Sequence, residues 1–248
     1  MKRIPQRRSA AGKHQRPLFS RELAILFEDE ALIAVNKPPG LLAVPAPGSD
    51  APSALTFLSE HLKKQRESLF TVHRIDRFVS GVLLFSKTKS DRDVLVRQFL
   101  SHTPARHYLA IVRGHLASEG GTLVHHFRKH GMHQELSTAK DPNATRAELS
   151  YSVERPLQQA SLLRVTLVTG LQNQIRVQLA AIGHPVIGDR KYCPKEASET
   201  RIARVALHAE YLQILHPRTA KPVTIECAPP SDFRSLLNSL SPRTGPKL

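Results

Sequence analysis

The chain has 248 residues, 40% of them hydrophobic, so it can bury a core and is not a disordered polymer. Its two cysteines form no Cys-x-x-Cys pair, which excludes a disulfide framework and the usual zinc-finger patterns. The 36 Lys and Arg residues against 21 Asp and Glu residues give a net charge of +15, which favours a polyanionic partner such as nucleic acid.

The first predicted segment is a flexible basic arm at residues 1–17. It carries several Lys and Arg residues, has no acidic residue and offers no apolar face to bury. Two short apolar segments follow, Leu23–Phe27 and Leu32–Asn36, and Glu28-Asp29-Glu30 between them predicts a β-hairpin. Lys37-Pro38-Pro39-Gly40 then ends the second strand.

The rest of the chain alternates between helical and strand patterns. A helix opens at Pro52 and Ser53 and carries three leucines on one side, Leu55, Leu58 and Leu62. Six segments have the apolar or alternating pattern of strands: Val82–Phe85, His107–Val112, Ala147–Val153, Leu162–Val168, Ala206–Leu215 and Val223–Cys227. Three further helices are indicated by their ends: Ser90-Asp91-Arg92-Asp93 as a capping box, Leu171 to Gly183, and Ser231-Asp232 as a final cap.

Many strands with intervening helices predict an α+β domain at residues 18–235. Its core would be a mixed, largely antiparallel sheet with flanking helices. Beyond it, residues 236–248 are expected to form a loose C-terminal tail, because Pro, Gly and basic residues dominate its end.

The densest polar cluster beside a predicted core strand is His73-Arg74-Ile75-Asp76-Arg77. Side chains at strand–loop junctions are often presented into clefts, and a carboxylate between two arginines stays ionised. An ionised Asp76 can act as a nucleophile or base at a sugar carbon. From these residues alone the alternative stays open that Asp76 caps a turn and pairs with an arginine for stability.

The run from His73 to Thr88 resembles the signature segment of RluA-type RNA pseudouridine synthases. That pattern is HRLD, two residues, TSG, an apolar strand and Lys-Thr. The other matching pieces follow in order: Phe27–Leu41, Ala105–Gly114, Thr169-Gly170 with Gln174-Ile175-Arg176, Gly183–Asp189 with Tyr192, Leu207-His208-Ala209, His216-Pro217 and Ala228-Pro229-Pro230. The resemblance spans about residues 20 to 235 and implies the pseudouridine synthase fold with a central cleft.

The resemblance also implies roles for individual residues. Asp76 would be the catalytic aspartate, and Tyr108 would stack on the target base and help to move the proton at C5. Arg176 would pair with Asp76, and Ile175 would pack beneath the base. The remaining substrate-binding positions that we expect from the matched motifs are His73, Arg74, Arg77, Lys37 and Gln174.

Isomerisation of uridine breaks the N-glycosidic bond and joins C5 to C1′, with no redox change and no external nucleophile. We therefore expect no cofactor and no metal. Asp76 would either attack C1′ or remove the C2′ proton to form a glycal, and the sequence leaves both routes open. The uridine has to leave the base stack to reach a carboxylate, so base flipping is expected.

The resemblance makes structured ribosomal or transfer RNA the expected partner. We expect a monomer with no obligate protein partner and no membrane partner, since no apolar run approaches the roughly 18 residues of a membrane helix. No secretory signal pattern is found either, so a cytoplasmic location is expected. No separate S4-type domain is recognised, and the basic arm at 1–17 would partly replace it.

Two departures from the family pattern bear on the substrate. Leu171, Gln172 and Asn173 stand where Arg, Thr and His are usual, and Val79 stands where Thr is usual. The set of Asp76, Tyr108 and Arg176 is retained, so catalysis is expected to survive. The identity of the RNA and of the uridine is left open.

Four histidines lie close together in the sequence: His125, His126, His130 and His133. No Cys and no acidic residue accompanies them at a metal-ligand spacing, so we expect a solvated loop or an RNA-facing surface. Two other classes of function are alternatives to a pseudouridine synthase. One is a non-catalytic RNA-binding ribosome assembly factor on the same scaffold. The other is a metal-dependent nuclease or hydrolase, for which the sequence lacks the expected carboxylate-rich pattern.

Overall fold

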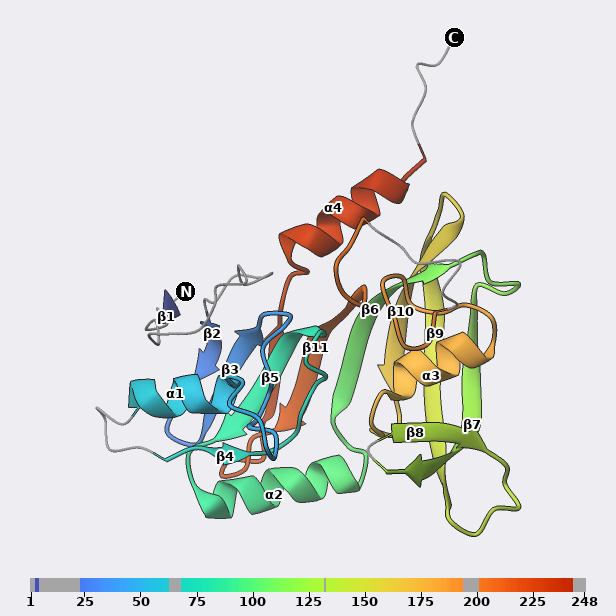
Figure 1. Cartoon of the computed structure of the whole chain (residues 1–248). Coiled ribbons are helices and arrows are strands. Elements are labelled where there is room, and N and C mark those ends of the chain that lie inside the picture. The colour runs from blue at the N-terminus through green and yellow to red at the C-terminus, as the bar shows by residue number, and fades with distance from the viewer. Residues whose placement is uncertain (1–2, 5–22, 63–67, 132, 194–200, 243–248) are drawn as a thin grey trace. The chain divides into compact units, whose positions relative to one another are not determined.

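The computed structural model describes residues 3–4, 23–62, 68–131, 133–193 and 201–242 (Figure 1). The chain divides into two compact units. The first unit contains Met1–Arg106 and Ala209–Ala228, and the second contains His107–His208 and Pro229–Leu248. In the part of the chain that is described, no helix has the length and apolar character needed to span a membrane. Most of the predicted arm at 1–17 lies outside the described residues.

The first unit is built on a sheet with the strand order β1-β2-β3-β5-β11, to which β4 adds at β5 and β12 at β11. The strands are β1 (Arg3–Ile4), β2 (Leu23–Glu28), β3 (Leu32–Lys37), β4 (Phe70–Thr71), β5 (Ser80–Ser86), β11 (Leu207–Leu215) and β12 (Pro222–Glu226). The predicted hairpin is confirmed, since β2 and β3 pair antiparallel. Its turn is fixed by Asp29, whose carboxylate accepts hydrogen bonds from the main-chain N–H groups of Ala31 and Leu32, both at 2.8 Å.

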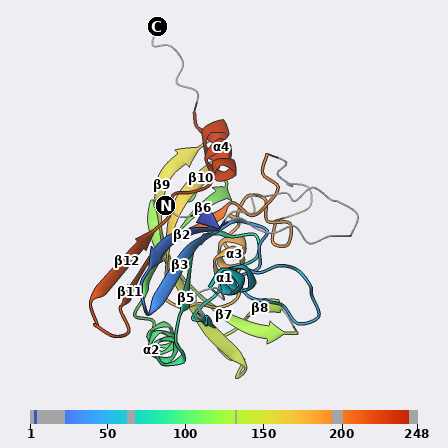
Figure 2. The same ribbon diagram turned by 90° about the vertical axis from the view of Figure 1, so that its left-hand side faces the viewer.

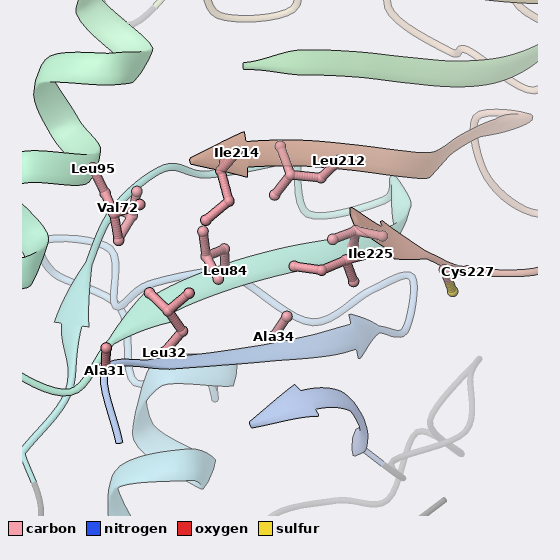
Figure 3. Packing of buried hydrophobic residues seen from close by; sticks show 11 residues of the cluster. Ala31, Leu32, Ala34, Val72, Leu84, Leu95, Leu212, Ile214, Ile225 and Cys227 are labelled. Carbon is pink, nitrogen blue, oxygen red and sulfur yellow. The ribbon is translucent and has the colours of Figure 1, made fainter. Parts of the chain in front are cut away.

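Both faces of this sheet are buried, which explains why β3 and β5 are apolar at successive positions. Side chains Leu83 and Phe85 pack on one face against α1 (Ala54–Leu62). The opposite face carries Leu84 and packs against α2 (Lys89–Leu100), as Figure 3 shows. Figure 2 shows the two helices on opposite sides of β3 and β5.

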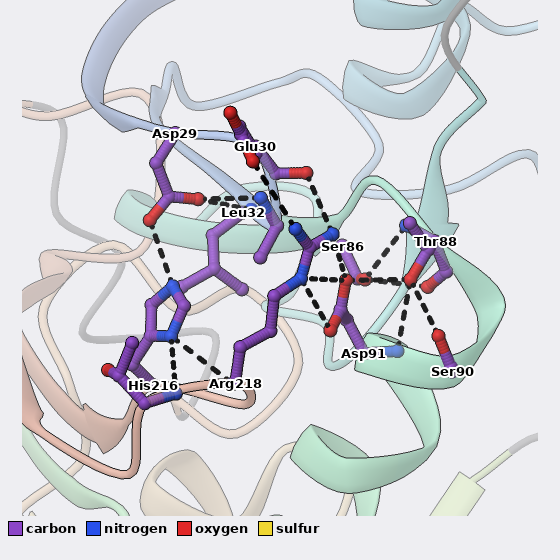
Figure 4. A network of polar contacts seen from close by, with 11 residues as sticks. Asp29, Glu30, Leu32, Ser86, Thr88, Ser90, Asp91, His216 and Arg218 are labelled. Atoms are coloured by element: carbon purple, nitrogen blue, oxygen red, sulfur yellow. Dashed lines mark hydrogen bonds and ion pairs between the residues drawn. The ribbon is translucent and has the colours of Figure 1, made fainter.

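A polar network ties the first hairpin to α2 and to the β11–β12 turn (Figure 4). His216 Nε2 lies 3.0 Å from Asp29 Oδ2, and Arg218 donates to the buried Asp91 carboxylate at 2.8 Å. The Thr88 hydroxyl accepts from the main-chain N–H of Asp91 and caps α2. The predicted cap at Ser90 is therefore wrong by two residues, because Thr88 has the extended backbone of an N-cap and Ser90 is already helical.

The second unit is built on a sheet with the strand order β6-β10-β9-β7-β8. Its elements are β6 (Ala105–Arg113), β7 (Gly120–His130), β8 (His133–Ser137), β9 (Ala144–Leu157), β10 (Ala160–Leu167), α3 (Gln174–Ala181) and α4 (Ser231–Leu240). Strand β6 begins two residues before the unit does, and the neighbouring pairs β6–β10, β10–β9, β9–β7 and β7–β8 are antiparallel. Strands combined with a few helices in each unit confirm the α+β class.

Two expectations about the second unit change. Of the two alternatives for the histidine-rich segment, the solvated loop is wrong, because β9 pairs with β7 over nine positions from Gly120 to Arg128 and β7 and β8 form a hairpin. The RNA-facing surface stays a prediction. The C-terminal helix α4 extends to Leu240, beyond the tail boundary drawn at 235. Its side chains Phe233, Leu236 and Leu240 are buried, and this apolar stripe keeps the helix ordered.

Candidate active site

Asp76 begins a tight turn in the loop between β4 and β5 of the first unit. Its carbonyl oxygen accepts a hydrogen bond from the N–H of Val79 at 3.1 Å, so Arg77 and Phe78 occupy the centre of the turn. Ile75 before the turn and Val79 after it are buried, with 6% and 2% of their surfaces exposed. Two buried anchors therefore hold the half-buried Asp76 at the surface of the unit.

Lys37 fixes this turn from inside. Its ammonium group donates to the carbonyl oxygens of Pro38 at 3.0 Å, Leu41 at 2.9 Å and Arg77 at 3.0 Å, and the side chain is fully buried. A buried ammonium is tolerated where such acceptors replace its water shell. Lys37 therefore acts as a positioning residue, and we no longer expect it to contact the substrate directly.

A second pair of contacts joins the Asp76 turn to the segment that follows β3. The N–H of Gly40 donates to the Arg77 carbonyl at 2.8 Å, and Arg77 Nε donates back to the Gly40 carbonyl at 2.9 Å. The side chains of Arg74 and Arg77 are exposed, as expected for groups that bind phosphate. Directly after the turn, a Cβ at Gly81 would collide with the Ala209 carbonyl, so only glycine lets β11 lie against this end of β5.

His73 is half-buried, and its ring is engaged by contacts inside the unit. Its Nε2 accepts a hydrogen bond from the N–H of Leu84 at 3.1 Å, and its ring stacks on Phe99 with centroids 4.8 Å apart. Desolvation, reinforced by the positive charge of Arg106, lowers the pKa of His73 from 6.5 to about 3. His73 is thus a neutral acceptor at physiological pH, and its geometry supports a structural role in place of the predicted substrate contact.

The other residues predicted for catalysis lie in the second unit. Tyr108 is half-buried on β6, opposite Val165 of β10. Arg176 lies on α3, and the adjacent Ile175 is buried with 5% of its surface exposed. The sequence signature thus places its catalytic candidates in both units, with Asp76 in the first and Tyr108 and Arg176 in the second.

Arg176 is held by a carboxylate that the sequence motifs did not single out. Its Nε and Nη2 donate to the two carboxylate oxygens of Asp189 at 2.6 and 2.9 Å, a bidentate pair in which Asp189 is 1% exposed. The guanidinium also lies over the Tyr192 ring, 5.1 Å from its centroid. Asp189 and Tyr192 belong to the matched piece Gly183–Asp189 with Tyr192. The sequence therefore marked both residues, but it did not indicate that they contact Arg176.

Asn173 is the third contact of Arg176, through its Oδ1 at 2.6 Å from Nη1. Its φ angle of 57° lies in the left-handed region, which Asn adopts more readily than most residues. Leu171 packs against the cluster of Phe127, Ala147 and Val177. We call the surroundings of Arg176, with Leu171, Asn173, Asp189 and Tyr192, the Arg176 corner. Two of the departures from the family pattern contribute to it: Leu171 fills its core and Asn173 orients Arg176.

Gln174 is also an internal residue, with 2% of its surface exposed. Its Oε1 accepts from Thr169 Oγ1 and from the Leu171 N–H, both at 2.9 Å. Its Nε2 donates to the Glu148 carbonyl and to Gln178 Oε1, both at 3.0 Å. All its hydrogen-bonding atoms thus have internal partners, and we reassign Gln174 from substrate binding to support of the loop before α3.

Comparison with known proteins identifies the family of the chain. A family model described as RNA pseudouridylate synthase matches residues 31–181. The ribosomal large subunit pseudouridine synthase D of Zymomonas mobilis is 33% identical over 88% of this chain and 73% of its own length. The dual-specificity RNA pseudouridine synthase RluA of Escherichia coli is 33% identical over 85% of this chain and 94% of its own.

A solved structure shows the same fold. Human RNA pseudouridylate synthase domain containing 4 superposes with a TM-score of 0.73 at 20% identity, covering 87% of this chain and 92% of that one. The family model matches more than half of the sequence, and the two relatives are each 33% identical over most of it. The chain therefore belongs to the RNA pseudouridine synthase family of isomerases.

Proposed function

We propose that this enzyme converts specific uridines of structured ribosomal or transfer RNA to pseudouridine, with Asp76 as the catalytic carboxylate. The observation that carries the proposal is the turn at Asp76, which is fixed by hydrogen bonds from the buried Lys37 and from Gly40 to the Arg77 carbonyl. A carboxylate on a preorganised turn meets a flipped nucleotide without a cost in loop ordering.

The chemistry needs one carboxylate and one aromatic support. The bond between N1 and C1′ breaks, the uracil turns, and C5 bonds to C1′, while the C5 proton leaves and N1 gains a proton. Asp76 either attacks C1′ or removes the C2′ proton. Tyr108 stacks on the base, a contact worth roughly 1–3 kcal/mol, and assists the transfer of the C5 proton.

Arg176 is proposed as the ionic partner of Asp76, and Ile175 as the apolar support beneath the base. Asp189 accepts hydrogen bonds from Nε and Nη2 of Arg176, which presets the direction of the side chain. The exposed Arg74 and Arg77 bind phosphates of the RNA.

The class of RNA is proposed from the relatives' names and from the motif resemblance. One relative is named for the ribosomal large subunit and the other for dual specificity towards RNA, which supports ribosomal RNA and a second class of RNA. Transfer RNA is proposed as that second class from the motif resemblance alone. The net charge of +15 fits a folded polyanion. Action as a monomer in the cytoplasm is part of the same proposal.

The test measures tritium release from RNA that is labelled at C5 of uridine. Wild-type protein should release tritium, and Asp76→Asn should release none while it still binds the RNA. The matched control is Asp50→Asn, the same change at an exposed carboxylate of the first unit, which should behave as wild type.

Tight binding without release from any cellular RNA by the wild type would instead support a non-catalytic assembly factor. Mapping of pseudouridine across the transcriptome of a deletion strain then identifies the target. A site that loses pseudouridine and regains it with the wild-type gene, but not with Asp76→Asn, is the substrate.

A further inference from the structure

Phe78 is an aromatic side chain that the proposed chemistry leaves unused. Of the phenylalanines in the described part of the chain, it alone is exposed, with 44% of its surface open to solvent. A single exposed apolar residue needs no explanation by itself. Phe78 is different because it lies two residues after Asp76, at the centre of the same turn.

The ring is held in place by the contacts of its neighbour. The Arg77 guanidinium lies over the Phe78 ring, 5.4 Å from its centroid, and Arg77 Nε is bound to the Gly40 carbonyl at 2.9 Å. The Arg77 carbonyl receives the buried Lys37 ammonium at 3.0 Å. Stacking of a ligand on this ring costs little conformational entropy of the protein, because the turn is already ordered.

The charge around the ring matches a nucleic acid. Arg74 and Arg77 are both exposed on the segment that carries Phe78. Aromatic faces combined with arginines are the usual platform for unpaired bases, since every base has a π-face and every nucleotide has a phosphate.

We infer that Phe78 stacks on an unpaired nucleobase next to the target uridine in the RNA strand. The inference rests on the proposed function, because a uridine that leaves the stack exposes the face of its neighbour. A ring two residues from the carboxylate stacks on that face. It thereby prevents the base stack from closing after the uridine has left it. Phe78 is therefore a specificity residue that favours uridines flanked by unpaired bases.

The first test uses the absence of tryptophan from the chain. Phe78→Trp places a single fluorescent ring in the turn, and stacking of a base quenches its emission. The change is made together with Asp76→Asn, so that the signal is independent of turnover. The probe is an RNA hairpin with unpaired uridines in its loop, compared with the same hairpin carrying abasic nucleotides in the loop.

The expected result is quenching by the uridine loop and none by the abasic loop, although both carry the same phosphates. The control is Leu100→Trp in the same background, a site on α2 that is 73% exposed and should respond equally to the two hairpins. Equal responses of Phe78→Trp to both hairpins would overturn the inference.

The second test separates stacking from folding in the tritium-release assay. Phe78→Leu should raise KM about tenfold and leave kcat within about twofold, because a stacked base contributes to binding on this scale. Phe78→Tyr should restore the wild-type KM. A wild-type KM for Phe78→Leu, or no rescue by Tyr, would contradict the inference. If instead the Phe78→Trp variant is quenched but the wild type releases no tritium, the proposed function fails and the stacking stands.

Discussion

The Asp76 turn of the first unit and the Arg176 corner of the second unit hold their functional side chains in opposite ways. In the turn, the contacts converge on a main-chain atom, since Lys37 and Gly40 both donate to the Arg77 carbonyl. In the corner, Arg176 is oriented by the side chains of Asp189 and Asn173. A main-chain acceptor survives most substitutions, whereas a side-chain acceptor disappears with one. The turn should therefore be sensitive mainly at Lys37, and the corner at every partner of Arg176.

The largest effect is expected for Lys37→Met. The change keeps the apolar stem but leaves the carbonyls of Pro38 and Leu41 without the Lys37 donor, while the Arg77 carbonyl retains the Gly40 N–H. The free energy of unfolding should fall by about 3 kcal/mol in chemical denaturation, because each unsatisfied buried acceptor is costly. Lys140→Met, at an exposed position, should change it by less than about 0.5 kcal/mol. Similar losses for the two variants would show that the turn does not depend on the ammonium.

Asp189→Asn tests the corner. The amide removes the charge and one of the two acceptors of the bidentate pair, so Arg176, whose side chain is 16% exposed, is held less firmly in one orientation. We expect kcat to fall about 100-fold with little change in KM, as for other losses of positioning. Glu154→Gln is the matched control, since its exposed pair with Arg164 lies in the same unit. A rise in KM with an unchanged kcat would assign Asp189 to RNA contact instead of positioning.

The third prediction concerns pH and the segment that leads into the turn. Burial lowers the pKa of His73 to about 3 in the folded state, so below pH 6.5 the unfolded chain takes up a proton that the folded chain refuses. Stability should therefore be lost as the pH falls from 6.5 towards 3, by at most about 1.4 kcal/mol per pH unit from this residue. His73→Gln keeps an acceptor for the Leu84 N–H and should flatten the dependence between pH 6.5 and 5, whereas His61→Gln on α1 should not. Parallel curves for His73→Gln and wild type would refute the assignment.

The smallest effect is expected at Asn173. Asn173→Gly keeps the left-handed backbone but removes the contact with Arg176, and kcat should fall about threefold because Asp189 still holds the guanidinium. Asn173→Ala should lose the same contact and, in addition, about 1 kcal/mol of stability from backbone strain. Thermal denaturation of the two variants beside their kinetics separates the two contributions. Equal stability of the Gly and Ala variants would remove the strain from the explanation.

Local patterns were sufficient where a segment carries its own signal. The first hairpin follows from two apolar runs and an acidic turn, and Asp29 makes the turn contacts itself. The last helix was expected to be capped at Ser231-Asp232, and it begins at Ser231 with Pro230 in the cap position. Strand β5 was expected at Val82–Phe85 and extends from Ser80 to Ser86 because β3 pairs along most of its length.

Local patterns failed where the partner strand decides the conformation. The sequence of β7 contains His125, His126 and Arg128, which are typical of a solvated loop, yet β9 supplies hydrogen-bonding partners along the strand. β-structure depends on such neighbours more than helices do. The start of α3 shows the same limit, since Asn173 adopts a left-handed conformation and the helix begins at Gln174, three residues after the expected Leu171.

The family, the α+β class and Asp76 as the catalytic candidate could all be read from the order of residues, because the signature from His73 to Thr88 is local. What the residues around Asp76 do became clear in the folded chain. In the sequence, Lys37 resembles a cation that binds RNA. In the folded chain its ammonium group instead donates to the carbonyl of Arg77, forty residues away, inside the unit. Likewise, the partner of Arg176 at Asp189 arises from the fold of the loop after α3. Burial and distant hydrogen-bond partners distinguish a ligand-binding cation from a structural one, and these are properties of the folded chain alone.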